Sequence, residues 1–400
     1  MSTGGFSKTR LARMGQVMTG HVERGALPGL VALVSRGGET HAEAIGTLAL
    51  DGSEPMRRDT IFRIASLTKP VVAAAAMILV EECRLRLDDP VDALLPEMAA
   101  RRVLKRLDGP LDDTVPTNRP ITMRDLLTFT LGFGAVLAPP GRYPIQAAMA
   151  EAGLNPGPTA LQVPPDQWML RLGALPLMHQ PGEGWMYHTG SDVLGVLIAR
   201  AAGQSLESFL RERLFEPLGM NDTGFHVPAG KLHRLPPSYA RDPATGGLRV
   251  HDDPHDSRWG RPAVFASGGG GLVSTADDLL AFWSMMLGKG RRHGGARVLS
   301  RLSVELMTQD HLTPAQRAAG APILGPGQGW GFGMAVAIRR VGLENVPGRF
   351  GWNGGTGTSG YADPTEGLVG LLMTQRMMDS AQPPALFRDF WTCAYQAIDE

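Results

Sequence analysis

Cysteine and lysine are both scarce in this chain, and each shortage excludes something. Two cysteines, Cys83 and Cys393, can form at most one bridge, so a disulfide framework is excluded. Both fall in apolar segments, which predicts two buried free thiols. Only five lysines occur, yet Lys and Arg together number 39, as do Asp and Glu. This balance, without any basic run, predicts no nucleic-acid partner and no attraction to an anionic membrane.

Long apolar runs are missing as well. The longest, residues 71–80, is too short to cross a bilayer and instead predicts a buried helix. Residues 1–18 lack the apolar stretch of a signal peptide. The sequence therefore predicts a soluble, cytoplasmic protein with no membrane partner, and it leaves the oligomeric state open. With 43% hydrophobic residues in 400, the chain can bury a large core.

Strand signals gather at the two ends of the chain, and helical signals fill the middle. Near the start, residues 30–35 and 41–46 predict a hairpin and residues 60–64 a third strand. Further strands are expected at 333–339, 349–353, 358–363 and 368–375. Helices are expected at 67–85, 123–128, 165–172, 191–202, 205–214, 275–287 and 384–398, after a first helix over residues 11–22.

This order predicts an α/β plus α fold with two parts. A central antiparallel sheet built from both chain ends would be flanked by the first, second and last helices. An inserted, mostly helical lobe would complete the molecule. We place the sheet domain at residues 1–88 and 300–400, the helical domain at 89–299, and the active site in the cleft between them.

The chain contains one Ser-x-x-Lys, Ser66-Leu67-Thr68-Lys69, at the point where the third strand should turn into the apolar helix. One helical turn would place the Lys69 amine beside the Ser66 hydroxyl, and these groups make a nucleophile and its base. The alternative is a helix-capping serine with a solvated lysine. Catalysis would also need a second proton-handling group and oxyanion donors.

Two later segments could supply those groups. Tyr187 stands just ahead of a predicted helix, and beside a lysine ammonium its pKa would fall, which makes it a second candidate base. The alternative is an ordinary buried tyrosine. Residues 350–358 are rich in glycine, which lets backbone approach a ligand closely and suits an oxyanion hole. The alternative there is a hairpin turn.

The order of the motifs is more specific than any one of them. Ser-x-x-Lys, then Tyr187-His188-Thr189 ahead of a helix, then Trp352-Asn353-Gly354 on a late strand resembles the serine β-lactamase and penicillin-binding-protein superfamily. Within it, the chain resembles the class C branch and especially the family VIII carboxylesterases. Segments 56–66, 121–128, 215–220 and 267–279 carry the same resemblance. It implies a β-lactamase/transpeptidase-like fold.

The resemblance also implies roles for particular residues. Ser66 would be acylated, and Lys69 and Tyr187 would share the general-base and general-acid duties, with the order of the two left open. The amides of Ser66 and Gly355 would bind the oxyanion. Burial and the positive end of its own helix would lower the pKa of Lys69. The substrate would contact Trp352, Asn353, Gly354, Thr189 and His188. No metal or other cofactor is implied.

Two departures from the family pattern bear on the substrate. Thr189 stands where penicillin-active members usually have asparagine, and it cannot bridge lysine and a substrate amide. Trp352 stands where they usually have lysine or histidine, so a cation that attracts a carboxylate is replaced by an apolar face. Both favour esters over lactams.

We therefore expect a serine hydrolase that cleaves small-molecule carboxylic esters with short-chain or apolar groups through an acyl-enzyme. The alternatives are a β-lactamase, a D-alanyl carboxypeptidase or amidase using the same residues, an acyltransferase, and a sensor domain that is acylated without turnover.

Other catalytic and binding motifs are absent. No Gly-x-Ser-x-Gly occurs, and the glycine run at 268–271 is not followed by the Lys-Ser/Thr of a phosphate-binding loop. Histidine and aspartate are dense over residues 251–256, but Pro254 interrupts a helix that could align them, which favours a solvated loop over a metal site.

Overall fold

The computed structural model describes residues 4–157, 161–292, 294–295 and 297–399. Its centre is a seven-stranded antiparallel sheet in the order β2-β1-β13-β12-β11-β10-β9. Its strands are β1 (Gly29–Arg36), β2 (Glu39–Gly46), β9 (Gln328–Trp330), β10 (Ala335–Ala337), β11 (Phe350–Gly354), β12 (Thr358–Asp363) and β13 (Leu368–Thr374). Leu30 of β1 pairs with Thr374 of β13, so the two ends of the chain form one sheet. The predicted fold class is confirmed.

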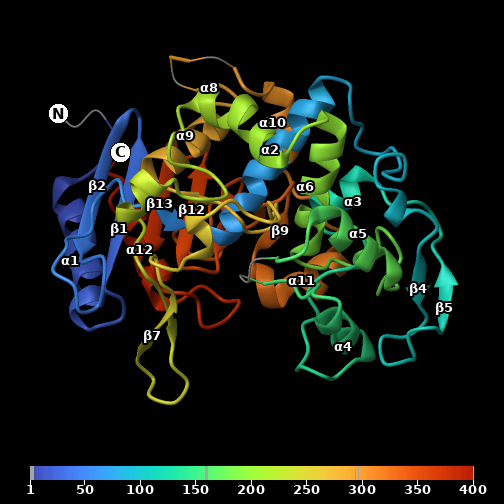
Figure 1. Cartoon of the computed structure of the whole chain (residues 1–400). Helices are drawn as coiled ribbons and strands as arrows, with labels where there is room; N and C mark the ends of the chain where they lie inside the picture. Colours follow the sequence, from blue (N-terminus) through green and yellow to red (C-terminus); the bar gives the residue numbers. More distant parts are fainter. Residues whose placement is uncertain (1–3, 158–160, 293, 296, 400) are drawn as a thin grey trace.

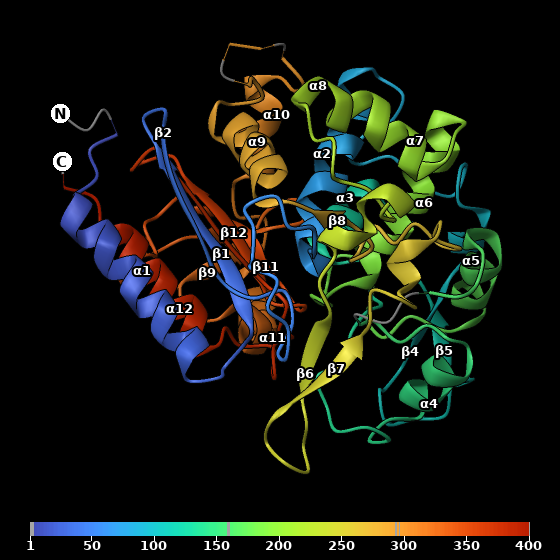
Figure 2. The ribbon, with the colours of Figure 1, turned by 60° about the vertical axis from the view of Figure 1, so that its left-hand side comes forward.

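One face of the sheet is covered by the first and last helices, α1 (Lys8–Glu23) and α12 (Ala385–Gln396), which lie side by side (Figure 2). Successive side chains of a strand point to opposite faces. In β1, Leu30, Ala32 and Val34 accordingly join the core under these helices. Val31 and Leu33 join the core on the other face. This burial on both faces explains the uninterrupted apolar run in β1.

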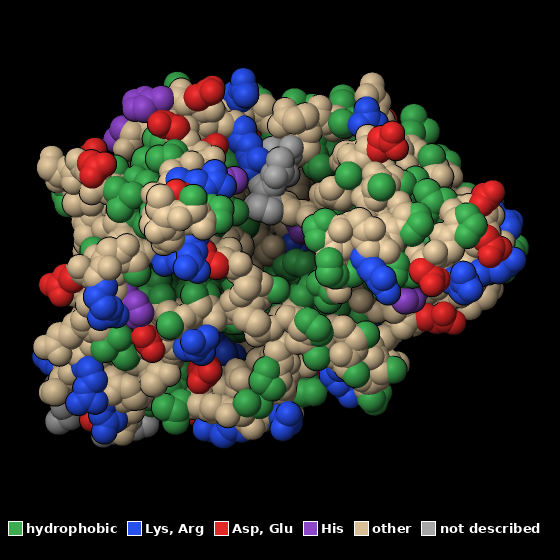
Figure 3. All heavy atoms as spheres, turned by 90° about the horizontal axis from the view of Figure 1, so that it is seen from below, with side chains coloured by type: hydrophobic (Ala, Val, Ile, Leu, Met, Phe, Trp, Pro, Cys, Tyr) green, Lys and Arg blue, Asp and Glu red, His purple; other side chains and the backbone are tan. Residues whose placement is uncertain are grey.

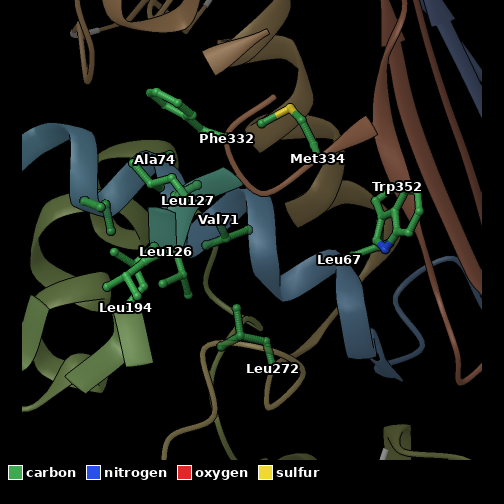
Figure 4. Packing of buried hydrophobic residues seen from close by; sticks show 14 of the residues in the cluster. Leu67, Val71, Ala74, Leu126, Leu127, Leu194, Leu272, Phe332, Met334 and Trp352 are labelled. Atoms are coloured by element: carbon green, nitrogen blue, oxygen red, sulfur yellow. The ribbon is translucent and has the colours of Figure 1, made fainter. Parts of the chain in front are cut away.

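The opposite face receives α9 (Ala276–Leu287), which packs on β12 and β13 although it falls within the range assigned from the sequence to the helical lobe. Next to it, α2 (Thr68–Glu81) runs between the sheet and the helical region (Figure 1). Side chains from α3 (Met123–Thr128), α6 (Thr189–Ala202) and the turn at 331–334 surround Val71 and Ala74 of α2 (Figure 4). A helix that is apolar all round requires such complete enclosure.

The rest of the chain consists of short elements and loops. The helices are α4 (Pro144–Glu151), α5 (Pro165–Ala174), α7 (Leu206–Leu210), α8 (Glu216–Leu218), α10 (Arg301–Met307) and α11 (Pro314–Leu324). Small two-stranded sheets pair β3 (Phe62–Arg63) with β8 (Val273–Ser274), β4 (Arg102–Leu104) with β5 (Thr114–Pro116), and β6 (Ser238–Arg241) with β7 (Leu248–Asp252).

Both cysteines are free, and Cys393 is buried as expected. The prediction that Cys83 is buried is wrong. Helix α2 ends before it, and Cys83 adopts a left-handed φ of 58° in an exposed turn. Within the described residues no single helix is long and apolar enough to cross a membrane. Two consecutive helical segments bent relative to each other, Thr189–Ala202 and Leu206–Leu218, reach the required length and apolar composition only when they are counted together.

Candidate active site

Ser66 lies in a single 3₁₀ turn, Ala65–Leu67, between β3 and α2. Ala65 holds a left-handed φ of 42°, a strained conformation that sharpens this turn. Ser66 remains half-buried, whereas Lys69 has no exposed surface at all. The Lys69 Nζ lies 2.9 Å from the Ser66 Oγ. The structure thus brings these two predicted residues into direct hydrogen-bond contact.

The environment of Lys69 decides its protonation. Burial lowers its pKa from 10.5 to about 7, although the charge of Asp192 opposes this shift. Besides Ser66, the amine contacts the carbonyl oxygen of Gly269 at 2.5 Å and Nδ1 of His188 at 3.2 Å. A large share of the lysine is therefore unprotonated at neutral pH. A hydroxyl beside a neutral amine is what general-base activation requires.

Behind Lys69, His188 and Asp192 extend the hydrogen-bonded chain. His188 Nε2 lies 3.2 Å from Asp192 Oδ2. Burial, and then the charge of Lys69, lower the pKa of His188, so its ring is neutral at pH 7. We assign the tautomer from the contacts: Nδ1 accepts from Lys69 and Nε2–H donates to Asp192. The structure places His188 between Lys69 and Asp192, and its predicted contact with substrate stays a prediction.

Asp192 is buried, and neighbouring protein groups donate hydrogen bonds to its carboxylate. Its Oδ1 accepts from the Ser267 hydroxyl at 2.6 Å and from the Gly269 amide at 2.9 Å. Burial alone would raise the pKa of this carboxyl, but the hydrogen bonds from His188, Ser267 and Gly269 together hold it below its usual value. A continuous series thus runs from Ser66 through Lys69 and His188 to an ionised carboxylate.

Asp192 and Gly269 belong to this hydrogen-bonded series although no motif in the sequence assigned them to the site. The signal for Asp192 was its position four residues after His188, at the start of a helix. The signal for Gly269 was the run of four glycines. A Cβ at Gly269 would lie 2.8 Å from His188 Nε2, and one at Gly268 only 2.3 Å from the Ser191 carbonyl oxygen. The run of four glycines therefore lets the 268–271 loop pack closely against His188 and Asp192.

Tyr187 lies just before α6, as predicted, within a cluster of aromatic rings. Trp352 Nε1 donates a 2.5 Å hydrogen bond to its hydroxyl, and the Lys69 Nζ lies 4.6 Å from its ring centre. The rings of Phe129, Trp185, Trp330 and His188 also lie against that of Tyr187. Burial raises the pKa of Tyr187 well above 10, although hydrogen bonds with Ser66 and Trp352 oppose it. The expected fall in its pKa is wrong, because burial outweighs the nearby lysine, and Tyr187 stays a protonated donor.

The turn after β11 is fastened to the backbone that precedes Ser66. Thr356 Oγ1 donates to the carbonyl oxygen of Arg63, and Thr358 Oγ1 donates to that of Ile64 at 3.2 Å. A Cβ at Gly354 would lie 2.3 Å from the Ile64 carbonyl oxygen, whereas one at Gly355 would meet nothing within 4 Å. The space beside Gly355 is therefore open, although the turn that contains Gly355 lies close to the backbone just before Ser66.

Two predicted substrate contacts are not brought to Ser66. Asn353 lies on the other side of β11 from Trp352, and its Oδ1 accepts from Ser359 Oγ at 2.7 Å. Thr189 is buried at the first position of α6, and in the described part of the chain it forms no side-chain hydrogen bond with the Ser66–Lys69 pair. Their contact with substrate stays a prediction.

Among the residues that the structure describes, no three or more His, Cys, Asp or Glu side chains are placed to hold a metal ion together. This includes the side chains of the 251–256 loop. Asp252 instead forms an ion pair with the buried Arg63.

The molecular surface is hollowed near the middle of one face, with hydrophobic side chains on part of the wall (Figure 3).

A family model described as Beta-lactamase matches residues 14–388. The chain belongs to the beta-lactamase family. It is 40% identical to Protein Rv1367c of Mycobacterium tuberculosis, over 89% of this chain and 88% of that protein. It is 32% identical to Esterase EstB of Burkholderia gladioli, over 93% and 92%.

Among solved structures, the chain is similar to EstCE1, a hydrolase with promiscuous acyltransferase activity. The two share 25% identity and a TM-score of 0.81, and the match covers 97% of this chain and 99% of that one. Sequence and structure thus agree on a beta-lactamase-fold enzyme family that includes an esterase.

Proposed function

We propose that this beta-lactamase family member is a serine carboxylesterase that forms an acyl-enzyme on Ser66. The observation that carries the proposal is the 2.9 Å contact between the Ser66 hydroxyl and a fully buried lysine whose pKa is lowered to about 7. The likeness to Esterase EstB and EstCE1 over nearly the whole chain supports the same reaction class.

In the first half-reaction, neutral Lys69 takes the proton of Ser66 as Oγ attacks the ester carbonyl carbon. The negative charge on the carbonyl oxygen is stabilised by the amides of Ser66 and Gly355. The C–O bond to the alcohol then breaks. The Tyr187 hydroxyl, hydrogen-bonded to Ser66, protonates the leaving alkoxide and regains a proton from the Lys69 ammonium.

In the second half-reaction, water attacks the acyl carbon and gives its proton to neutral Lys69. The bond from the acyl carbon to Ser66 Oγ breaks, and Lys69 returns that proton to the serine as the carboxylic acid leaves. The His188–Asp192 pair orients Lys69 from behind through the 3.2 Å contact between His188 Nδ1 and Lys69 Nζ. We call these two positioning residues.

The substrate is an uncharged ester at the reacting group. Trp352 and Tyr187 place two aromatic rings at the site, 5.7 Å apart between centres, where a cation would favour the carboxylate of a lactam. This composition supports a short-chain or apolar acyl or alkyl group, as in the family VIII esterases.

The test is kcat/KM for p-nitrophenyl butyrate and for nitrocefin on one preparation. We expect ester cleavage to dominate and to disappear in Ser66→Ala, whereas Ser380→Ala, an exposed serine, serves as the matched control. Preferred turnover of nitrocefin would make the protein a β-lactamase. Full activity of Ser66→Ala would remove the proposed site.

An acyltransferase is the second candidate, because EstCE1 is described as having promiscuous acyltransferase activity. There an alcohol would replace water in the second half-reaction. Adding increasing methanol to the butyrate assay and separating methyl butyrate from butyric acid measures the partition directly. A product mixture that follows the methanol-to-water ratio would indicate a hydrolase without selection for the alcohol.

A further inference from the structure

The run of four glycines lies along the 3₁₀ turn that contains the proposed nucleophile. The Gly269 carbonyl oxygen accepts from the Lys69 amine at 2.5 Å. The Leu272 carbonyl oxygen accepts from the Ile64 amide at 3.0 Å. These two hydrogen bonds stand on either side of Gly270 and hold it beside the turn.

Gly270 leaves space next to the nucleophile. A Cβ at this position would lie 3.8 Å from the carbonyl carbon of Ala65, the atom bonded to the Ser66 nitrogen, and 3.9 Å from Cε1 of His188. Both distances are ordinary van der Waals separations. A side chain could therefore stand between the Ser66 turn and its surroundings, and glycine leaves that place open.

Packing requires glycine at the rest of the run but not at Gly270. At the other three positions a Cβ would lie only 2.3 to 2.8 Å from the nearest atom, too close for nonbonded atoms. Gly270 also lacks the positive φ that favours glycine in many turns. The consequence of this glycine is thus the open space itself.

The open space continues into a cavity. Gly270 and Ser267 line a cavity of about 60 Å³, and Ser267 donates to Asp192 behind the site at 2.6 Å. Since a single water needs roughly 10–15 Å³, this volume holds about four to six atoms of that size. Apolar side chains form much of the wall, namely Phe225 and Phe265, which are buried, and Pro262, Ala263 and Val264, which are exposed at the opening.

Two arginines also line the cavity, but neither requires an anionic ligand. Arg261 is exposed to solvent. The guanidinium carbon of Arg258 lies 3.9 Å from the ring centre of Trp259, and the nearby carboxylate of Asp252 attracts its charge. Trp259 Nε1 donates to the Gly271 carbonyl oxygen at 3.1 Å, which fixes the glycine run against this wall. A positive charge here disfavours a cationic ligand, so the cavity suits an uncharged chain.

We propose that this cavity receives a short, uncharged hydrocarbon chain of the ester, and that Gly270 determines the chain length by leaving access from Ser66 open. We assign the chain to the acyl group. The leaving alcohol departs toward Tyr187 and the oxyanion lies at Gly355, and neither of these residues lines the cavity. The assignment to the acyl group rests on the proposed esterase function.

The first test needs only the wild-type protein. It compares kcat/KM for p-nitrophenyl acetate, butyrate, hexanoate and decanoate. Each buried methylene should raise kcat/KM about fourfold as far as hexanoate. The gain should stop before decanoate, whose chain exceeds the volume of the cavity. Equal kcat/KM for acetate and hexanoate would overturn the proposal.

Gly270→Leu tests the access from Ser66, because its side chain would stand between the nucleophile and the cavity. The ratio of kcat/KM for hexanoate to that for acetate should fall at least tenfold, roughly the value of two buried methylenes. The matched control is Gly230→Leu, at an exposed glycine where a Cβ would meet nothing within 4 Å, and it should leave the ratio unchanged. An unchanged ratio in folded Gly270→Leu would refute the role of Gly270.

Gly270→Ala keeps this test decisive if the leucine variant does not fold, because its single added carbon meets only ordinary separations. It should lower the same ratio about fourfold, the value of one methylene. A ratio equal to that of the wild type would count against the proposal.

Two isomeric esters distinguish the acyl chain from the alcohol. Gly270→Leu should lower kcat/KM far more for ethyl hexanoate than for hexyl acetate. The opposite order would overturn the assignment to the acyl group and place the alcohol in the cavity.

A wild-type protein that cleaves no ester would refute the proposed function, and binding would then decide the cavity separately. Calorimetric titration of Ser66→Ala protein should give tighter binding of ethyl hexanoate than of ethyl acetate, and adding Gly270→Leu should remove the difference. Equal binding of the two esters to Ser66→Ala protein would show that the cavity does not receive the chain.

Discussion

Lys69→Met provides a test of the buried amine that is independent of catalysis. In the unfolded chain the lysine has its ordinary pKa of 10.5, and in the folded protein its pKa is about 7. The unfolded chain therefore binds a proton that the folded protein releases. The free energy of unfolding is unaffected by this group above pH 10.5, falls as the pH drops toward 7, and stays low below that. Lys69 thus destabilises the fold at neutral pH.

The magnitude follows from the two pKa values. At about 1.4 kcal/mol per pH unit, the cost of Lys69 is roughly 5 kcal/mol at low pH and about 1 kcal/mol near pH 10. Methionine does not titrate, but it leaves the Ser66 hydroxyl and the Gly269 carbonyl without their amine, at a cost of about 1–3 kcal/mol at every pH. Relative to wild type, the variant should gain roughly 4 kcal/mol on going from about pH 10 to about pH 6.5.

Urea unfolding of both proteins at these two pH values, followed by far-UV circular dichroism, measures the gain. The control is Lys289→Met, because Lys289 is exposed and its 3.0 Å ion pair with Glu305 contributes little to the free energy of unfolding. We expect Lys69→Met to be inactive and more stable than wild type at the lower pH. A difference between the two pH values below about 1 kcal/mol would show that burial does not neutralise this lysine.

Three further predictions concern activity. The kcat/KM of the wild type should rise about tenfold per pH unit below 7 and level off above it if neutral Lys69 acts as the proposed base; a limb nearer pH 10 would contradict this role. Asp192→Asn should move that limb to lower pH, because the carboxylate charge raises the pKa of Lys69, whereas the exposed Asp166→Asn should not move it. Trp352→Phe removes the donor to Tyr187 and should lower kcat roughly tenfold, and an unchanged kcat would mean that this hydrogen bond does not help position the phenol.

Regular elements were predictable where local pattern and burial agree. The strand at 358–363 and the helix at 123–128 have the bounds expected from alternation and turn residues. The strand expected at 333–339 is only Ala335–Ala337. Gly333 has a left-handed φ of 72°, and a Cβ there would lie 2.8 Å from the Lys69 carbonyl oxygen. That tight contact with α2 involves a residue far away in the chain, so no local pattern reports it.

The candidate site likewise has features that the sequence predicts and features that depend on distant segments of the chain. The spacing of Ser-x-x-Lys within one helical turn was sufficient to predict the contact between Ser66 and Lys69. The pKa direction of Tyr187 was not predictable, because it depends on rings contributed by separate segments of the chain. The bond between the Gly269 amide and Asp192, 77 residues apart, likewise depends on how a loop folds back.

The pairing of β1 with β13 has a consequence for biosynthesis. The ribosome completes the apolar strand β1 long before it makes β13, which pairs with it in the sheet. Until then β1 has an unpaired edge, and the Ser66 segment lacks the turn at 354–358 that is bonded to it. An unpaired apolar edge makes the nascent chain prone to aggregate until this late pairing forms. Fragments that end before residue 350 should therefore accumulate as insoluble protein without the activity proposed for Ser66.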